Sequence, residues 1–117
     1  DIVKQNFKRK YILEFAATLL KKPKKIKSIL NIINNFAVQD KISLKIKYED
    51  FLKNKQEIYD LMRDGYKITV ILDNSFEPNF KDIESLQMFE FVIINQGLKY
   101  YEDIINNKGN LHNIIEI

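Results

Sequence analysis

The residues best suited to chemistry in this sequence follow its apolar segments. Asp73 and Asn74 come directly after the apolar run 68–72, and their carboxylate and amide oxygens are ligands of the kind that divalent cations bind. Glu14 follows another apolar segment and would add a second carboxylate, whereas Lys45 could pair with Asp73 and put an ammonium group in place of a cation. Acidic residues after strands also form turns and helix caps. The pattern therefore indicates either a weak cation site or a structural turn.

Residue types that other common sites require are scarce. The chain has no cysteine, which excludes a thiol nucleophile, a disulfide and every cysteine-based zinc or iron–sulfur site. His112 is the only histidine, so no histidine pair can hold a metal, and we expect this residue on the surface. The three glycines, Gly65, Gly97 and Gly109, are isolated and form no phosphate-binding loop. We accordingly expect no cofactor and no bound metal.

Charge is distributed unevenly along the chain. The formal net charge is +3, but residues 1–47 contain 12 basic and 3 acidic side chains, while residues 48–117 contain 7 basic and 13 acidic ones. The most basic run, residues 21–27, has no interleaved aromatic residues and matches no nucleic-acid-binding motif. We interpret it as a solvated loop and first helical turn, and we do not expect nucleic acid as a partner.

The composition is that of a soluble globular protein. Of the 117 residues, 45% are hydrophobic and 30% are charged, which fits a single domain spanning residues 1–117. No apolar run approaches the roughly 20 residues that cross a bilayer, and we expect a cytoplasmic protein. Because the sequence opens at Asp1 without a methionine or an apolar leader, we also expect it to be a segment of a longer protein.

Hydrophobic periodicity divides the chain into alternating strands and helices. Alternating or continuously apolar segments predict strands near residues 11–16, 42–47, 68–73, 89–94 and 113–117. Apolar residues at three- and four-residue spacing predict helices over residues 24–37, 51–62, 80–87 and 98–105, the second followed by a left-handed cap at Gly65. This order predicts the α/β class, with a mostly parallel sheet and right-handed crossovers through the helices.

Such a pattern fits a doubly wound sheet, a flavodoxin-like module or part of a (β/α)8 barrel. A complete barrel typically takes about 250 residues, so the chain can supply only part of one. Ile71 and Val92 lie in the two most continuously apolar strands, so both should be buried, with helices on one side and the interior of the sheet on the other. In all three folds the chemistry lies at the carboxyl ends of the strands. The positions of interest are therefore Glu14 and residues 45–48, 73–76 and 93–96.

The order and spacing of these segments resemble the EAL-type cyclic-di-GMP phosphodiesterases over roughly residues 11–105. The family's V-N-L-S strand, followed by an apolar pair and D-P, resembles residues 13–23, and its L-E-I-T-E strand resembles residues 44–48. The family's next helix ends with a leucine and, a few residues later, a glycine before the following strand, and this segment resembles residues 61–68. Its D-D-F-G strand end falls on residues 73–76, and its K-I-D strand end falls on residues 93–95. The resemblance implies part of a (β/α)8 barrel. The E-A-L tripeptide and the last two barrel strands have no counterpart.

The residues that carry the family's chemistry are mostly replaced. The resemblance places its metal-ligand positions at Glu14, Lys45, Asp73 and Asn74, of which only Asp73 keeps the family's residue. The lysine of K-I-D, which helps to organise the attacking water, is Ile93 here. Two-metal phosphodiester hydrolysis needs several carboxylates. The resemblance therefore implies a remnant ligand-binding rim without catalytic residues, formed by Glu14, Lys45, Asp73, Asn74 and Asn95.

These observations predict a catalytically inactive EAL-like regulatory or protein-interaction domain of a bacterial cyclic-di-GMP signalling protein. Its partner would be another protein or a second copy, since an unfinished parallel sheet leaves edge strands at residues 11–16 and 113–117, and a cyclic dinucleotide stays open as a ligand. One alternative is a receiver-like or anti-sigma-antagonist-like domain with Asp73 or Ser75 as phosphate acceptor, although the acidic pair that a receiver needs near its first strand is missing. The other is part of an active cyclic-di-GMP phosphodiesterase.

Overall fold

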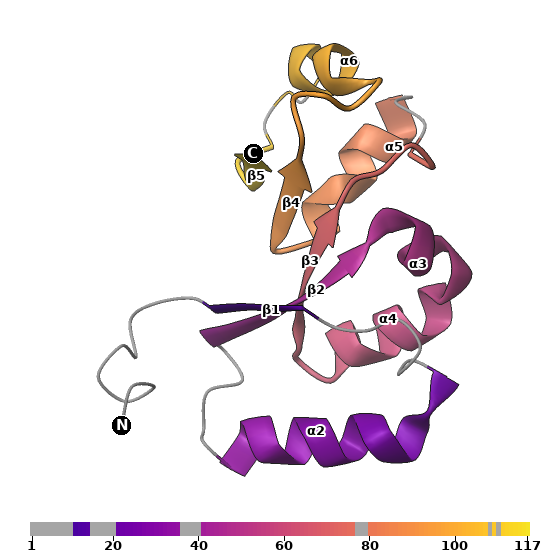
Figure 1. The fold of residues 1–117 in the computed structure, drawn as a ribbon, viewed down its shortest axis with the longest axis vertical. Coiled ribbons are helices and arrows are strands. Elements are labelled where there is room, and N and C mark those ends of the chain that lie inside the picture. Colours follow the sequence, from indigo (N-terminus) through magenta and orange to yellow (C-terminus); the bar gives the residue numbers. More distant parts are fainter. Residues whose placement is uncertain (1–10, 15–20, 36–40, 77–79, 108, 110) are drawn as a thin grey trace.

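The computed structural model describes residues 11–14, 21–35, 41–76, 80–107, 109 and 111–117 of the chain. Its centre is one sheet of five parallel strands (Figure 1). The strands are β1 (Tyr11–Glu14), β2 (Ile42–Lys47), β3 (Lys67–Ile71), β4 (Phe91–Ile94) and β5 (Ile114–Glu116). The predicted α/β class with a parallel sheet is confirmed, and β1 and β5 are the two edge strands, as expected.

Strand order distinguishes the folds that the sequence left open. A doubly wound or flavodoxin-like sheet has a shuffled strand order, with helices on both faces. Here each strand pairs with the strands before and after it in the chain, as neighbouring strands of a (β/α)8 barrel do. The sheet is therefore wound in one direction only, like a barrel segment.

Helices fill the connections between strands. They are α2 (Pro23–Asn35) after β1, α3 (Tyr48–Lys53) and α4 (Lys55–Arg63) after β2, α5 (Phe80–Ser85) and the 3-10 helix η3 (Leu86–Met88) after β3, and α6 (Tyr101–Asn106) after β4. The single helix predicted over residues 51–62 is wrong, because Asn54 breaks it: its φ is −136° and its Nδ2 donates to the Asp50 carbonyl. Gly65, with a φ of 95°, is the left-handed cap that the sequence predicts.

The hydrophobic core lies between the sheet and its helices. Strand residues that face the helices, such as Leu44 and Val70, are at most 1% exposed. They belong to one cluster with helix residues such as Ile58, Leu86 and Ile104. Figure 1 shows α3, α4 and α5 on the same side of the strands. Helix packing therefore buries one face of the sheet.

The opposite side of the sheet carries the strand residues that alternate with this core, and we term it the open face. It consists of Ile12, Glu14, Ser43, Lys45, Lys47, Lys67, Thr69, Ile71, Phe91, Ile93 and Ile115, none of which belongs to the core cluster. The expected burial of Val92 is confirmed, with 0% exposed, but Ile71 is only half-buried and that prediction is wrong. Ile71 is the last residue of β3 and lies on this open face, whereas its register partner Ile93 and its strand neighbour Thr69 on the same face are 8% and 0% exposed.

Candidate functional site at the carboxyl edge of the sheet

The structure separates the predicted rim residues into two groups. Glu14 and Lys45 are register partners on the open face, and Lys45 pairs in turn with Thr69 of β3. Asp73 lies four residues beyond Thr69, which corresponds to about 13 Å of extended chain. The register therefore does not bring Lys45 to Asp73. The remaining predicted residues lie where β3 and β4 end, and they are Asp73, Asn74 and Asn95.

Asp73 ties two connections of the fold together. Its Oδ2 accepts a hydrogen bond from the backbone N–H of Glu49 (3.0 Å), in the first turn of α3. Its Oδ1 accepts hydrogen bonds from the backbone N–H of Ser75 (2.9 Å) and from the Ser75 hydroxyl. The carboxylate thus closes a turn after β3 and caps the helix that follows β2. Both of its oxygens are bonded to protein donors.

These contacts determine the charge of Asp73. Burial alone would raise the pKa of its carboxyl group, but hydrogen bonds from the Ser75 hydroxyl and from the backbone N–H groups of Glu49 and Ser75, together with the charge of Lys47, outweigh burial. The pKa of Asp73 is therefore lowered from its ordinary value. The carboxyl group is therefore ionised at neutral pH, and the positive charge of Lys47 favours this ionised form.

Replacing Asp73 with asparagine should reduce stability in a pH-dependent way. Because folding lowers the pKa of Asp73, the ionised group stabilises the fold above its unfolded pKa, near 3.8, and this contribution is lost as the pH falls through the lower folded pKa. We expect Asp73→Asn to lose about 0.5–2 kcal/mol of unfolding free energy at neutral pH, the usual cost of a lost cap. Below the unfolded pKa the difference from the wild type should shrink. Urea unfolding across this pH range measures it.

The control for this experiment is Asn74→Ala. Asn74 is the exposed neighbour of Asp73 and carries no charge, so its replacement should have a small effect at every pH. A loss for Asp73→Asn that stays constant from neutral to acidic pH would contradict the charge assigned to Asp73.

Asn95 also has a structural partner. Its Oδ1 accepts a hydrogen bond from the backbone N–H of Gly97 (2.7 Å), and its carbonyl accepts one from the N–H of Leu98 (2.9 Å). A Cβ atom at Gly97 would lie 3.2 Å from this Oδ1, so a side chain there would crowd the turn. Asn95 therefore shapes the turn after β4 in the way that Asp73 shapes the turn after β3.

The rim offers little to a divalent cation. Among the residues that the structure describes, no three Asp, Glu or His side chains are grouped so that they could hold a metal ion. A hard cation needs several oxygen ligands. The side-chain oxygens of Asp73 and Asn95 already accept hydrogen bonds from backbone N–H groups. Glu14 has Lys45 as its neighbour in register. The geometry of these side chains fits a role in stabilising the turns after the strands better than it fits a metal centre.

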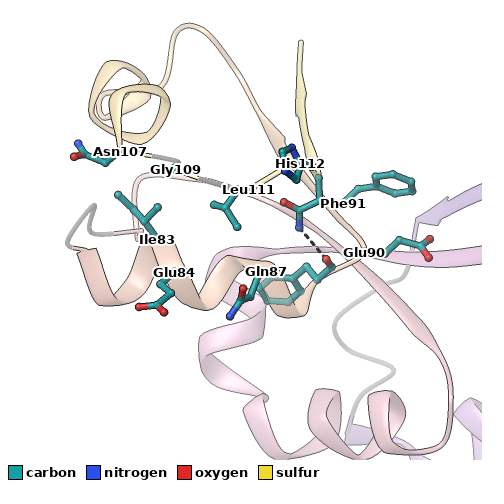
Figure 2. A pocket seen from close by; sticks show the side chains of 11 residues that line it. Ile83, Glu84, Gln87, Glu90, Phe91, Asn107, Gly109, Leu111 and His112 are labelled. Carbon is teal, nitrogen blue, oxygen red and sulfur yellow. Dashed lines mark hydrogen bonds between the residues drawn. The ribbon is translucent and has the colours of Figure 1, made fainter.

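A hollow of about 650 Å³ lies at the opposite, amino edge of the sheet (Figure 2). Its lining includes Ile83 of α5, Gln87 of η3 and the segments that lead into β4 and β5. Asn113 ties this wall together, because its Nδ2 donates to the carbonyls of Leu86 (3.2 Å) and Phe89 (2.9 Å), the latter bond drawn as the dashed line in Figure 2. The amide nitrogen of Asn113 thus joins the segment before β5 to the segment before β4.

His112 lines this hollow and is exposed, as the sequence predicts. Sequence reasoning missed the hollow itself, because its lining comes from separate segments whose residues share no spacing or motif. In parallel α/β folds, ligands bind at the carboxyl ends of the strands. The hollow lies at the other end, so the carboxyl edge stays the candidate site.

Comparisons with protein-family models, with curated proteins and with solved structures give no match for this chain. In the described part of the chain, no helix has the length and apolar character needed to cross a membrane. The function is therefore inferred from the geometry and chemistry of the residues themselves.

Proposed function

We propose that this chain is a catalytically inactive, EAL-like domain that acts in regulation or protein association within a signalling protein. The observation that carries the proposal is the bonding of Asp73, the one metal-ligand position at which the sequence keeps the residue of the family that it resembles. Both carboxylate oxygens accept hydrogen bonds from protein donors. A metal ion would have to compete with the first turn of α3 for this carboxylate.

The other rim positions support the same proposal. Ile93, in place of the family's lysine, is apolar and 8% exposed, and it has no group that could organise an attacking water. Asn95, in place of the aspartate, accepts a hydrogen bond within its own turn. Lys45, in place of a glutamate, adds a positive charge where hydrolysis through two metal ions needs a carboxylate. Each replacement removes one part of the hydrolytic machinery.

Strand order favours this proposal over a receiver-like domain. A receiver-like sheet is doubly wound, whereas the five strands here follow the order of the chain. The two candidate phosphate acceptors are also bonded to each other, since the Ser75 hydroxyl donates to Asp73. These observations support a scaffold for association rather than a phosphate acceptor.

Purified protein should not hydrolyse cyclic di-GMP when Mg²⁺ or Mn²⁺ is present. Because Asp73 is bonded to Glu49 and Ser75, Mn²⁺ should also leave the thermal unfolding midpoint unchanged, whereas a ligand that binds the native state raises it. Chromatography of the reaction mixture measures hydrolysis, and differential scanning calorimetry with and without metal measures binding.

Asp73→Ala is the matched variant for both measurements. Turnover or stabilisation by Mn²⁺ that occurs in the wild type and disappears in Asp73→Ala would identify Asp73 as a metal ligand. The chain would then be part of an active phosphodiesterase. No turnover and no metal-dependent shift in either protein is the expected result.

A further inference from the structure

Helix α2 and the two residues before it carry lysines on the side that faces away from the core. The apolar residues Ile26, Ile29 and Leu30 of this helix belong to the hydrophobic core or pack against it. Because an α-helix has about 3.6 residues per turn, Lys24 lies on the opposite side of the helix from Ile26. All the lysines of this segment are exposed, and we term them the lysine face: Lys21, Lys22, Lys24, Lys25 and Lys27.

Little in the described chain neutralises the lysine face. The Nζ of Lys21 lies 2.7 Å from a carboxylate oxygen of Glu57 in α4, and no other lysine of the face forms an ion pair with a described residue. Residues 23–35, which form α2, include no aspartate or glutamate. The positive charge of this helix is therefore presented to a partner outside the described chain.

The outward side of α2 also carries an apolar group. Ile32 is 59% exposed and lies two helical turns beyond Lys25, on the same side of the helix. A helix with lysines on its polar surface and an apolar side chain beside them is typical of segments that bind at the interface of a membrane. A phosphate backbone alone would offer Ile32 no apolar surroundings.

The position of α2 in the molecule allows such a contact. Figure 1 shows this helix across the lower end of the molecule, with α6 and β5 near the upper end. The acidic residues Glu102 and Asp103 belong to α6, and Glu116 belongs to β5. A negatively charged surface would therefore attract the α2 end and repel the opposite end, which orients the molecule on that surface.

We propose that α2 docks on a membrane surface that contains anionic phospholipids, with the lysine face against the lipid headgroups and Ile32 at their boundary with the acyl chains. Clusters of about four to eight basic residues on an amphipathic helix are typical of binding to such lipids. Residues 21–35 include no aromatic side chain on which a nucleic-acid base would stack. These features favour a membrane over a nucleic acid as the partner.

This proposal is independent of the proposed function, which rests on Asp73 at the other side of the fold's chemistry, the carboxyl edge of the sheet. Failure to bind a membrane would leave the expected lack of hydrolysis untouched. Hydrolysis of cyclic di-GMP would overturn the proposed function and leave the docking of α2 standing.

Sedimentation with lipid vesicles tests the docking. The vesicles consist of phosphatidylcholine alone or of phosphatidylcholine with about 30% phosphatidylserine, a lipid of the anionic cytoplasmic leaflet. We expect the protein to bind only the vesicles with phosphatidylserine, and added salt should weaken this binding because it screens the charges. Equal binding to both kinds of vesicle, or binding to neither, would overturn the proposal.

The double variant Lys24→Glu/Lys25→Glu tests the lysine face. We expect at least about 25-fold weaker binding, since each basic residue near such a surface strengthens binding about fivefold. Acidic residues in the first turn of a helix are favourable, so α2 should still form. The matched control is Lys55→Glu/Lys99→Glu, which changes the net charge equally at exposed positions of other segments and should weaken binding by at most about threefold. Circular dichroism establishes that each variant is folded.

Ile32→Gln tests the apolar contact. Because Ile32 is 59% exposed, the fold should accommodate glutamine there. We expect about fivefold weaker binding to the vesicles with phosphatidylserine, since the variant loses the burial of an apolar side chain. Binding to a single-stranded oligonucleotide, which has no acyl chains, should not change with this substitution.

The outcomes are distinct. Loss of vesicle binding in Lys24→Glu/Lys25→Glu, with retention in Lys55→Glu/Lys99→Glu, supports the proposal. Binding that survives the first variant, or that falls equally in both, overturns it, because other charges of the chain must then hold the vesicle. Tighter binding to the oligonucleotide than to the vesicles, lost in the first variant, overturns it in favour of a nucleic acid. If Ile32→Gln binds vesicles as the wild type does, the placement of Ile32 is wrong.

Discussion

Phe76→Ala is expected to lower the free energy of unfolding by about 3–5 kcal/mol, the usual cost of removing a buried phenylalanine side chain. Phe76 is 0% exposed and packs edge-on against Tyr48, with ring centroids 5.1 Å apart. Its backbone N–H donates to the Asp73 carbonyl (3.2 Å), so the ring anchors the turn after β3. Urea unfolding measures the change, and a midpoint shift at unchanged slope isolates stability.

Tyr59→Ala is the matched control for this substitution. The Tyr59 ring also contacts an aromatic ring, that of Phe51 at 5.9 Å, but the residue is 40% exposed. We expect a cost of about 1 kcal/mol, since an aromatic pair contributes little beyond the area that it buries. Equal costs for the two variants would show that Phe76 does not anchor the core.

Removing one hydroxyl of the Ser43–Thr69 pair should cost more than removing both. The two oxygens lie 2.6 Å apart, and both residues are 0% exposed. Ser43→Ala leaves the buried Thr69 hydroxyl without its partner, at a cost of about 1–3 kcal/mol. The double variant Ser43→Ala/Thr69→Val replaces both hydroxyls with apolar groups and should lie within about 1 kcal/mol of the wild type.

A double-mutant cycle by urea unfolding measures this coupling. Thr69→Val alone should cost about as much as Ser43→Ala, because either change leaves one buried hydroxyl behind. If the costs instead add, so that the double variant is the least stable, water satisfies the remaining hydroxyl and this part of the open face is wet.

Local sequence signals were sufficient to locate the five strands and their parallel arrangement. β-Branched residues such as Ile68, Thr69 and Val70 fit a pleated, covered surface, and they form β3. Gly65 could be recognised as a helix cap, because a φ of 95° is readily adopted mainly by glycine. The alternation of strands with helices then predicts parallel pairing, since each helix carries the chain back to the starting edge.

What local patterns could not supply depends on contacts between separate parts of the chain. An apolar run such as that ending near Ile71 does not reveal whether helices cover one face of a sheet or two. The break at Asn54 depends on the bond of its side chain to the Asp50 carbonyl. Asp73 could be predicted as a cap or a cation ligand, but its helix partner, the Glu49 N–H, lies 24 residues earlier. Only the fold decides between the two roles.

The order of the strands affects how such a chain folds and how the number of its strand–helix units can vary. Each strand pairs only with its neighbours in the chain, so the main contacts join one strand–helix unit to the next. A structure built from nearest-neighbour contacts resembles a repeat array, in which folding can begin at one unit and spread to the next. Adding or removing a unit at either end would leave the other pairings unchanged. A sheet of this kind can therefore vary in length through evolution without a change in its architecture.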